Sequence, residues 1–147
     1  MLATRRIRAA KLADLRNITS FLKDNGLPTN GVEKCLNNFV VAEDKNGSWV
    51  GIAGLELCGK SALLRSVAVN KEYRGLGHGR KLVDAVLRNA KAQRVQTVYL
   101  LTESADSYFK GLGFEAIDRQ NIEEPVKASP EFTECCKTAV AMRKTIA

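Results

Sequence analysis

Apolar residues recur with a helical period in several segments of the chain. Between residues 11 and 25 they fall on every third or fourth position, which is the spacing of one helix face. The same period returns over residues 80–92, and a shorter helix is predicted over residues 105–110. A further short helix is predicted over residues 32–38, because Asn30 and Glu33 have the spacing of a capping box.

Other apolar runs have the length and composition of β-strands. The pair Asn46-Gly47 between two of these runs predicts a tight hairpin. Residues 121–130, which contain two prolines, are expected to form a loop. The resulting order is a strand, two helices, three antiparallel strands, a helix, a strand, a helix and a strand. The strands are predicted over residues 6–9, 39–42, 49–57, 62–69, 97–101 and 138–142.

The composition is that of a globular protein. With 147 residues, 45% of them hydrophobic, the chain is expected to form one domain over residues 1–147 with a buried core. No apolar run approaches the roughly 20 residues of a transmembrane helix, and no apolar segment follows the basic N-terminus as in a signal peptide. We therefore expect no membrane association and a cytoplasmic location.

The net charge points to an anionic partner. Subtracting 16 acidic from 23 basic residues gives +7, which suits nucleic acid, a membrane surface or a phosphorylated small molecule. The basic residues form no block and are not interleaved with aromatic residues, so nucleic acid is not expected. The single histidine and four cysteines lack the spacing of a metal site. The adjacent Cys135 and Cys136 could capture a trivalent arsenical, although packing is the commoner role for such thiols.

A glycine-rich segment carries the strongest chemical signal in the chain. Residues 73–80 contain three glycines directly before a predicted helix, so backbone N–H groups are available to an anion. The segment fits neither a P-loop nor a dinucleotide fingerprint, because arginine, lysine and leucine follow the last glycine. It fits R-x-x-G-x-G at Arg74, Gly77 and Gly79.

With this loop placed after an apolar strand, and with Leu112-Gly113-Phe114 after a short helix, the chain resembles the GNAT superfamily of acetyl-CoA-dependent N-acetyltransferases. Short sequence segments such as Gly54-Leu55-Glu56 are similar to those of a small branch of this superfamily that is associated with arsenic resistance. That branch is related to short N-acetylglutamate synthases. The resemblance implies an α/β (α+β) fold. Its mixed central sheet would contain a splayed pair of parallel strands, with helices on both faces.

The resemblance also implies that acetyl-CoA is the cosubstrate, with no metal. Its pantetheine arm would lie between the splayed strands and pair with backbone groups of Val67 and Val69, and its pyrophosphate would lie on the glycine-rich loop. The residues expected to contact the cofactor are Val67, Ala68, Val69, Arg74, Gly75, Leu76, Gly77, His78, Gly79, Arg80, Thr102 and Phe109.

Acetyl transfer by direct attack in a ternary complex needs a base for the amine and a donor for the thioester carbonyl. The backbone N–H of Val67 is the expected donor. Glu56 is the preferred base and Glu103 its rival, while a solvated surface charge is the other interpretation of Glu56. The family usually has a tyrosine four residues before the glycine of Gly-Phe, where this chain has Phe109 beside Tyr108. One residue turns a helical side chain by about 100°, so Tyr108 is expected to point elsewhere. Either a shifted helix accommodates Tyr108 or solvent protonates the thiolate, and solvent is the preferred source.

The acceptor is expected to be a small amine such as glutamate or its phosphinic or arsonic analogue. Arg65 alternates with Val67 and Val69, which predicts that it faces the cleft and binds a carboxylate, unless Glu56 is its internal partner. Protein acetylation and non-catalytic acyl-CoA sensing are the alternative functions, and a second copy of the chain is a candidate partner. The other expected acceptor contacts are Arg8, Ser66 and Glu103.

Overall fold

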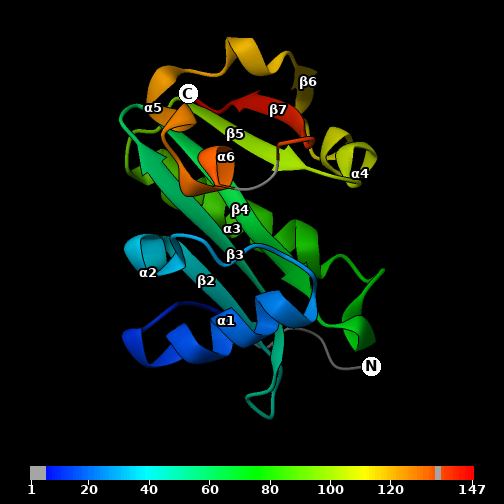
Figure 1. Cartoon of the computed structure of the whole chain (residues 1–147). Coiled ribbons are helices and arrows are strands. Elements are labelled where there is room, and N and C mark those ends of the chain that lie inside the picture. The colour runs from blue at the N-terminus through cyan, green and yellow to red at the C-terminus, as the bar shows by residue number, and fades with distance from the viewer. Residues whose placement is uncertain (1–5, 135–136) are drawn as a thin grey trace.

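A seven-stranded sheet forms the centre of the computed structural model, which describes residues 6–134 and 137–147 (Figure 1). The strand order is β1-β2-β3-β4-β5-β7-β6. Among the described residues, β4 and β5 are the one parallel pair, so the mixed sheet expected from the sequence is confirmed. The strands are β1 Arg6–Ala9, β2 Phe39–Glu43, β3 Trp49–Cys58, β4 Ser61–Val69, β5 Thr97–Thr102, β6 Glu115–Ile117 and β7 Val140–Thr145.

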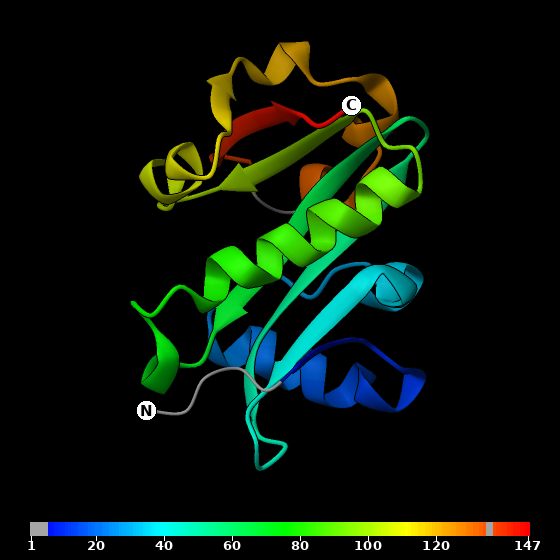
Figure 2. The same ribbon diagram turned by 180° about the vertical axis from the view of Figure 1, so that it is seen from behind.

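Helices cover both faces of this sheet. The long helix α3 crosses one face (Figure 2), whereas α1, α2, α5 and α6 lie on the other (Figure 1). Three-residue 3₁₀ turns precede α1 and α3 and follow α2. The helices are α1 Leu15–Asp24, α2 Val32–Cys35, α3 His78–Ala92, α4 Asp106–Gly111, α5 Glu124–Lys127 and α6 Pro130–Thr133.

The apolar run in β2 is explained by burial on both sides. Val40 and Ala42 belong to the hydrophobic cluster beneath α3, while Phe39 and Val41 belong to the cluster beneath α1. Successive side chains of a strand point to opposite faces, so residues 39–42, covered on both faces, are all apolar. The polar residue of the strand is Glu43 at its end, which pairs with Arg6 and Arg8. Burial on both faces therefore places this strand in the middle layer, between helices α1 and α3.

A bulge interrupts the alternation of β4. Ile52 pairs with Ala68 and Gly54 pairs with Arg65, so Ala53 alone lies opposite two residues of β4. The extra residue is accommodated at Ser66, whose φ of 61° lies in the left-handed region. Arg65 consequently shares a face with Ala68 and not with Val67 and Val69, which pack towards the α3 cluster. The expected alternation of Arg65 with the two valines is wrong for this reason.

The parallel strands separate just before the bulge. Ser61, Ala62 and Leu63 pair with Thr97, Val98 and Tyr99, and the register contains no later pair between these strands in the described chain. Both strands nevertheless continue, β4 to Val69 and β5 to Thr102. The expected splay is therefore confirmed, and it leaves a gap between two strand edges.

Differences from the predicted elements occur where short helices depend on caps. Residues 121–130 are not a plain loop: they contain α5 and the start of α6, because proline is tolerated in the first turn of a helix. The predicted capping box before α2 is also wrong. Gly31, with φ 77°, occupies the N-cap without a side-chain bond, and the Asn30 amide donates to Glu134 instead. Strand β6 was not expected, and the last strand starts two residues later than predicted, at Val140.

Candidate active site

A cavity of about 300 Å³ lies where β4 and β5 separate. Its volume is at the lower end of the roughly 300 to 1,000 Å³ that is usual for small-molecule sites. Segments that are distant in the sequence contribute its walls, including the connection between α1 and α2 and the helix α6. The lining residues are Asn25, Gly26, Leu27, Pro28, Leu64, Arg65, Ser66, Val67, Leu100, Leu101, Thr102, Glu103, Ser104, Ala105, Phe109, Glu131 and Ala139.

The glycine-rich loop leads from the end of β4 into α3. Gly77 is the N-cap of α3 with φ 86°, and the first turn of the helix contains no acidic residue. The N–H groups of this turn are therefore suited to a negatively charged group. The Arg74 guanidinium anchors the loop, since Nε donates to the Val69 carbonyl oxygen at 3.0 Å and Nη2 donates to Asn25 Oδ1 at 2.8 Å. Leu76 and Arg80 lie exposed in the same segment.

Phe109 and Tyr108 on α4 point in different directions, as the sequence predicted. Phe109 is buried and lines the cavity, whereas Tyr108 is 45% exposed and is not a lining residue of it. The Tyr108 hydroxyl lies over Gly79, at the place a Cβ of that residue would occupy. Tyr108 therefore covers the start of α3, and the side chain facing the cavity from α4 carries no ionisable proton.

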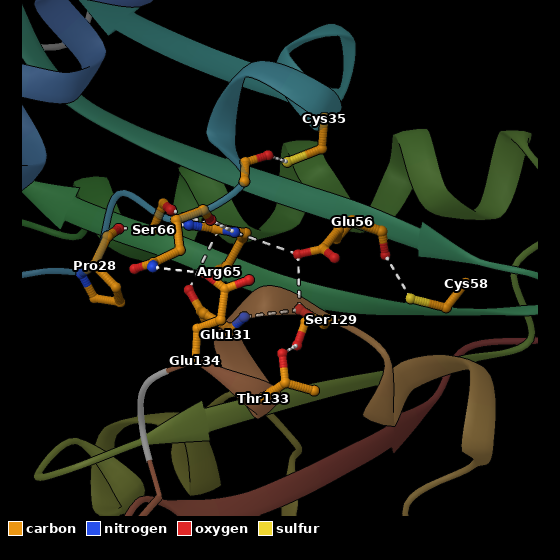
Figure 3. A network of polar contacts seen from close by, with 12 residues as sticks. Pro28, Cys35, Glu56, Cys58, Arg65, Ser66, Ser129, Glu131, Thr133 and Glu134 are labelled. Atoms are coloured by element: carbon orange, nitrogen blue, oxygen red, sulfur yellow. Dashed lines mark hydrogen bonds and ion pairs between the residues drawn. The ribbon is translucent and has the colours of Figure 1, made fainter.

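Arg65 is the centre of a buried polar network beside the cavity (Figure 3). Its side chain has no exposed surface and forms ion pairs of 3.3 Å with both Glu56 and Glu131. Its Nη1 also donates to the Asn30 carbonyl oxygen at 2.6 Å. The sequence left open whether Glu56 was an internal partner of Arg65, and the structure shows that it is. Glu131, the second partner, was missed.

Glu56 holds this network to helix α6. Its Oε1 accepts a hydrogen bond from the Ser129 hydroxyl at 2.9 Å, and Ser129 Oγ in turn accepts from the Glu131 backbone N–H at 3.1 Å. Ser129 is thus the N-cap of α6. Glu56 does not belong to the lining of the cavity. It links Arg65 on β4 to Ser129, the N-cap residue of α6.

Glu131 is a titratable group in the cavity wall. The residue is only 4% exposed, and burial raises the pKa of its carboxyl group to about 7, because the attraction of Arg65 does not offset the loss of hydration. The loop predicted from the sequence covers residues 121–130 and ends just before Glu131. The signal that could have located it is Ser129-Pro130, a capping residue followed by proline at the first helical position.

Replacing Glu131 with glutamine is expected to change how stability depends on pH. With a raised folded-state pKa, the native state binds more protons than the unfolded state between about pH 4.5 and 7, so this carboxyl group makes stability fall as pH rises through that window. Glutamine resembles the neutral acid and removes the fall. Denaturant unfolding at pH 5, 6, 7 and 8 should show that the free energy of unfolding of the variant increases relative to that of the parent protein as pH rises. Parallel curves would contradict the raised pKa, and Glu134→Gln, at an exposed position of the same segment, is the control.

The remaining predicted site residues are divided between the cavity and other places. Thr102 and Glu103 line it: Thr102 Oγ1 accepts from the Ala105 N–H, and the exposed Glu103 accepts from the Thr138 hydroxyl. Arg8 is not brought to the site. It forms ion pairs with Asp14 at 2.8 Å and Glu43 at 3.2 Å at the β1 edge of the sheet.

Ala68 and His78, two further predicted contacts, are not among the residues that line the cavity. Ala68 is buried in the cluster beneath α1. His78 is the first residue of α3, with its ring buried against Tyr73. Cys135 and Cys136 lie outside the described residues. Within the described part of the chain, no three metal-ligating side chains gather, and no helix is long and apolar enough to cross a membrane.

The separated parallel strands and the glycine-rich start of a helix beside them are the features that the resemblance to the GNAT superfamily implied. Residues 36–116, more than half of the chain, match the acetyltransferase (GNAT) domain family, and the chain belongs to that family. It is an acetyl-CoA-dependent N-acetyltransferase, with acetyl-CoA as its cosubstrate.

Three similar proteins illustrate the relationship. The chain is 29% identical to an uncharacterized N-acetyltransferase of Chlorobaculum tepidum, with 95% of this chain and 96% of the relative covered. It is 30% identical to an amino-acid acetyltransferase of Pseudomonas fluorescens, over 74% of this chain but 27% of the relative. N-acetylglutamate synthase of Neisseria gonorrhoeae, solved with coenzyme A and N-acetyl-glutamate, shares the fold at 16% identity. Its TM-score is 0.82 over 97% of this chain and 35% of that chain.

Proposed function

We propose that this enzyme transfers the acetyl group of acetyl-CoA to the primary amine of a small amino-acid-like acceptor by direct attack in a ternary complex. Glutamate, or an analogue in which a phosphinic or arsonic group replaces the side-chain carboxylate, is the proposed acceptor. The observation that carries this proposal is the cavity of about 300 Å³ beside the splayed strands. A volume of this size suits one small molecule, and α6 and residues 25–28 form part of its wall.

Acetyl-CoA is proposed to enter through the gap between β4 and β5. Backbone groups of Val67 and Val69 would pair with the pantetheine arm, and the Val67 N–H would donate to the thioester carbonyl. The pyrophosphate would lie on residues 74–80, where the start of α3 and the side chains of Arg74 and Arg80 supply positive potential. Thr102 and Phe109, which line the cavity, would contact the acetyl end.

Two relatives support an amino-acid acceptor. The Pseudomonas protein is named an amino-acid acetyltransferase, and the Neisseria enzyme was solved with N-acetyl-glutamate. The net charge of +7 suits an anionic cosubstrate together with an acidic acceptor. Membership of the arsenic-resistance branch stays a prediction from the sequence, as does the use of an arsonic analogue.

A panel of acceptors tests the proposal. We expect acetyl-CoA to release free coenzyme A with glutamate or its phosphinic or arsonic analogues, and the product to be the N-acetyl derivative by mass spectrometry. The matched control is 2-oxoglutarate, which has both carboxylates of glutamate and no amine, and which should release none. Turnover confined to peptides would favour protein acetylation. Tight acetyl-CoA binding without turnover on any amine would favour a sensor.

A further inference from the structure

We propose that Glu131 is the general base that takes the proton from the attacking amine, and that Glu56 is a positioning residue. The inference deepens the proposed function and rests on it. Glu131 lines the cavity into which the acceptor amine is proposed to bind, whereas Glu56 is not a lining residue and pairs with the buried Arg65 (Figure 3). A general base must be within hydrogen-bond reach of the proton that it removes. Of the two carboxylates, Glu131 is the one placed in the lining.

Among the described residues, Arg65 and Ser129 hold Glu131 in place. Arg65 Nε holds Oε2 at 3.3 Å from the β4 side, and the Arg65 side chain is itself immobilised by Glu56 and by the Asn30 carbonyl oxygen. The Ser129 cap holds the backbone of Glu131 through its N–H. A carboxylate fixed at both its backbone and its side chain is held in one orientation, which general base catalysis requires.

Glu103 is the other carboxylate in the cavity lining, and its surroundings suit the role less well. Glu103 is exposed, and both of its oxygens accept from the Thr138 hydroxyl, at 3.1 and 3.3 Å. Glu131 is 4% exposed. A base whose pKa lies near neutral pH combines the ionised form with useful basicity, and burial raises the pKa of Glu131 to about 7.

The charges around Glu131 come from several elements. Arg65 on β4 favours its ionised form, and Glu56 on β3 opposes it. Cys35 on α2 lies close enough for its thiol to respond to both Arg65 and Glu131, and burial raises the pKa of that thiol to about 11. On α5, Glu124 and Lys127 pair with each other at 3.5 Å. At neutral pH the thiol stays protonated, so within the described part of the chain Arg65 and Glu56 are the charged groups that tune Glu131.

The proposed reaction balances with one proton released. Glu131 takes a proton from the acceptor ammonium, and the neutral nitrogen attacks the thioester carbonyl carbon to form a new C–N bond. The tetrahedral intermediate collapses with cleavage of the C–S bond. The second nitrogen proton is transferred, through solvent, to the departing thiolate. Glu131 then passes its proton to water, which leaves the amide, free coenzyme A and one proton as products.

The pH dependence of kcat/KM for the acceptor tests this role. We expect Glu131→Gln to lower this constant about 100-fold or more at pH 7.5, which is within the range for loss of a general base. In the parent enzyme, kcat/KM should rise with pH around pH 7 as Glu131 ionises, and this limb of the pH profile should disappear in the variant. The acetyl-CoA dissociation constant should stay within a few-fold of the parent value. Glu103→Gln is the matched control in the same cavity, and it should keep the limb near pH 7.

Each other outcome also decides the question. A limb that survives in Glu131→Gln, or that disappears in Glu103→Gln, overturns the role. If Glu131→Gln does not fold, Glu131→Asp decides: the retracted carboxylate should lower the rate and move the limb, and an unchanged profile overturns the proposal. Turnover on peptides alone would refute the small acceptor, and the same profiles measured with a peptide would then test Glu131 separately. Absence of turnover with every amine would overturn both proposals.

Discussion

Replacing Arg65 with methionine is expected to lower the free energy of unfolding by about 3 to 5 kcal/mol. The guanidinium has no exposed surface and lies between Glu56 and Glu131. Methionine fills similar space but leaves both carboxylates without their cation, and the cost of a buried unpaired charge is large. Denaturant unfolding measures the loss, and Arg65→Lys should recover only part of it because the bidentate fork is missing.

Arg8→Met is the control for this experiment. Arg8 also forms ion pairs with two carboxylates, Asp14 and Glu43, but its side chain is 17% exposed at the edge of the sheet. Its removal is expected to cost roughly 1 kcal/mol or less.

A selective rise in the acceptor KM for Arg65→Met, with stability unchanged, is the result expected from the sequence alone. Such a result would show that Arg65 serves the acceptor and not the network.

Gly77→Val is expected to weaken acetyl-CoA binding about 100-fold or more. Gly77 begins α3 with φ 86°, a conformation that a β-branched residue resists, so valine would turn the loop N–H groups away from the pyrophosphate. Loss of two charge-assisted hydrogen bonds of about 1.5 kcal/mol each corresponds to that factor. Isothermal calorimetry with acetyl-CoA measures the effect.

The hairpin between β2 and β3 supplies a matched control. Gly47 has φ 81°, and a Cβ there would have open space, as it would at Gly77. Gly47→Val therefore imposes a similar backbone strain, in the order of 1 to 2 kcal/mol, far from the loop. The free energy of unfolding should fall by a comparable amount in both variants, and the affinity for acetyl-CoA should fall in Gly77→Val alone. Equal affinity in the two variants would place the pyrophosphate elsewhere.

The sequence predicted the elements whose pattern is local and regular. Helix α3 and strands β2 to β5 have long apolar periods, and the splay of β4 and β5 followed from the family resemblance. Helices α5 and α6 have four residues each, so their periodicity carries no signal. Caps and tertiary contacts such as the Ser129 to Glu56 bond specify them instead.

The candidate site was predicted less completely than the fold. Val67 and Thr102, each predicted from one strand, line the cavity, whereas the role of the glycine-rich loop in binding stays a prediction. Glu131 was missed because only the folded chain brings it to Arg65. The face of Arg65 was predicted wrongly because alternation assumes an unbroken strand, and a single left-handed residue at Ser66 changes the parity.

The bulge at Ser66 makes β4 a strand with two different registers. Up to Arg65, its odd-numbered positions lie on the α1 side, and after Ser66 the odd-numbered valines lie on the α3 side. If the same residues alternated without the bulge, the faces of the strand end would be exchanged. Ala68 would turn towards α3 and the valines towards α1, so both hydrophobic layers would be mismatched at once. The extra residue thus allows one continuous strand to present Arg65 on one side of the sheet and Val67 and Val69 on the other.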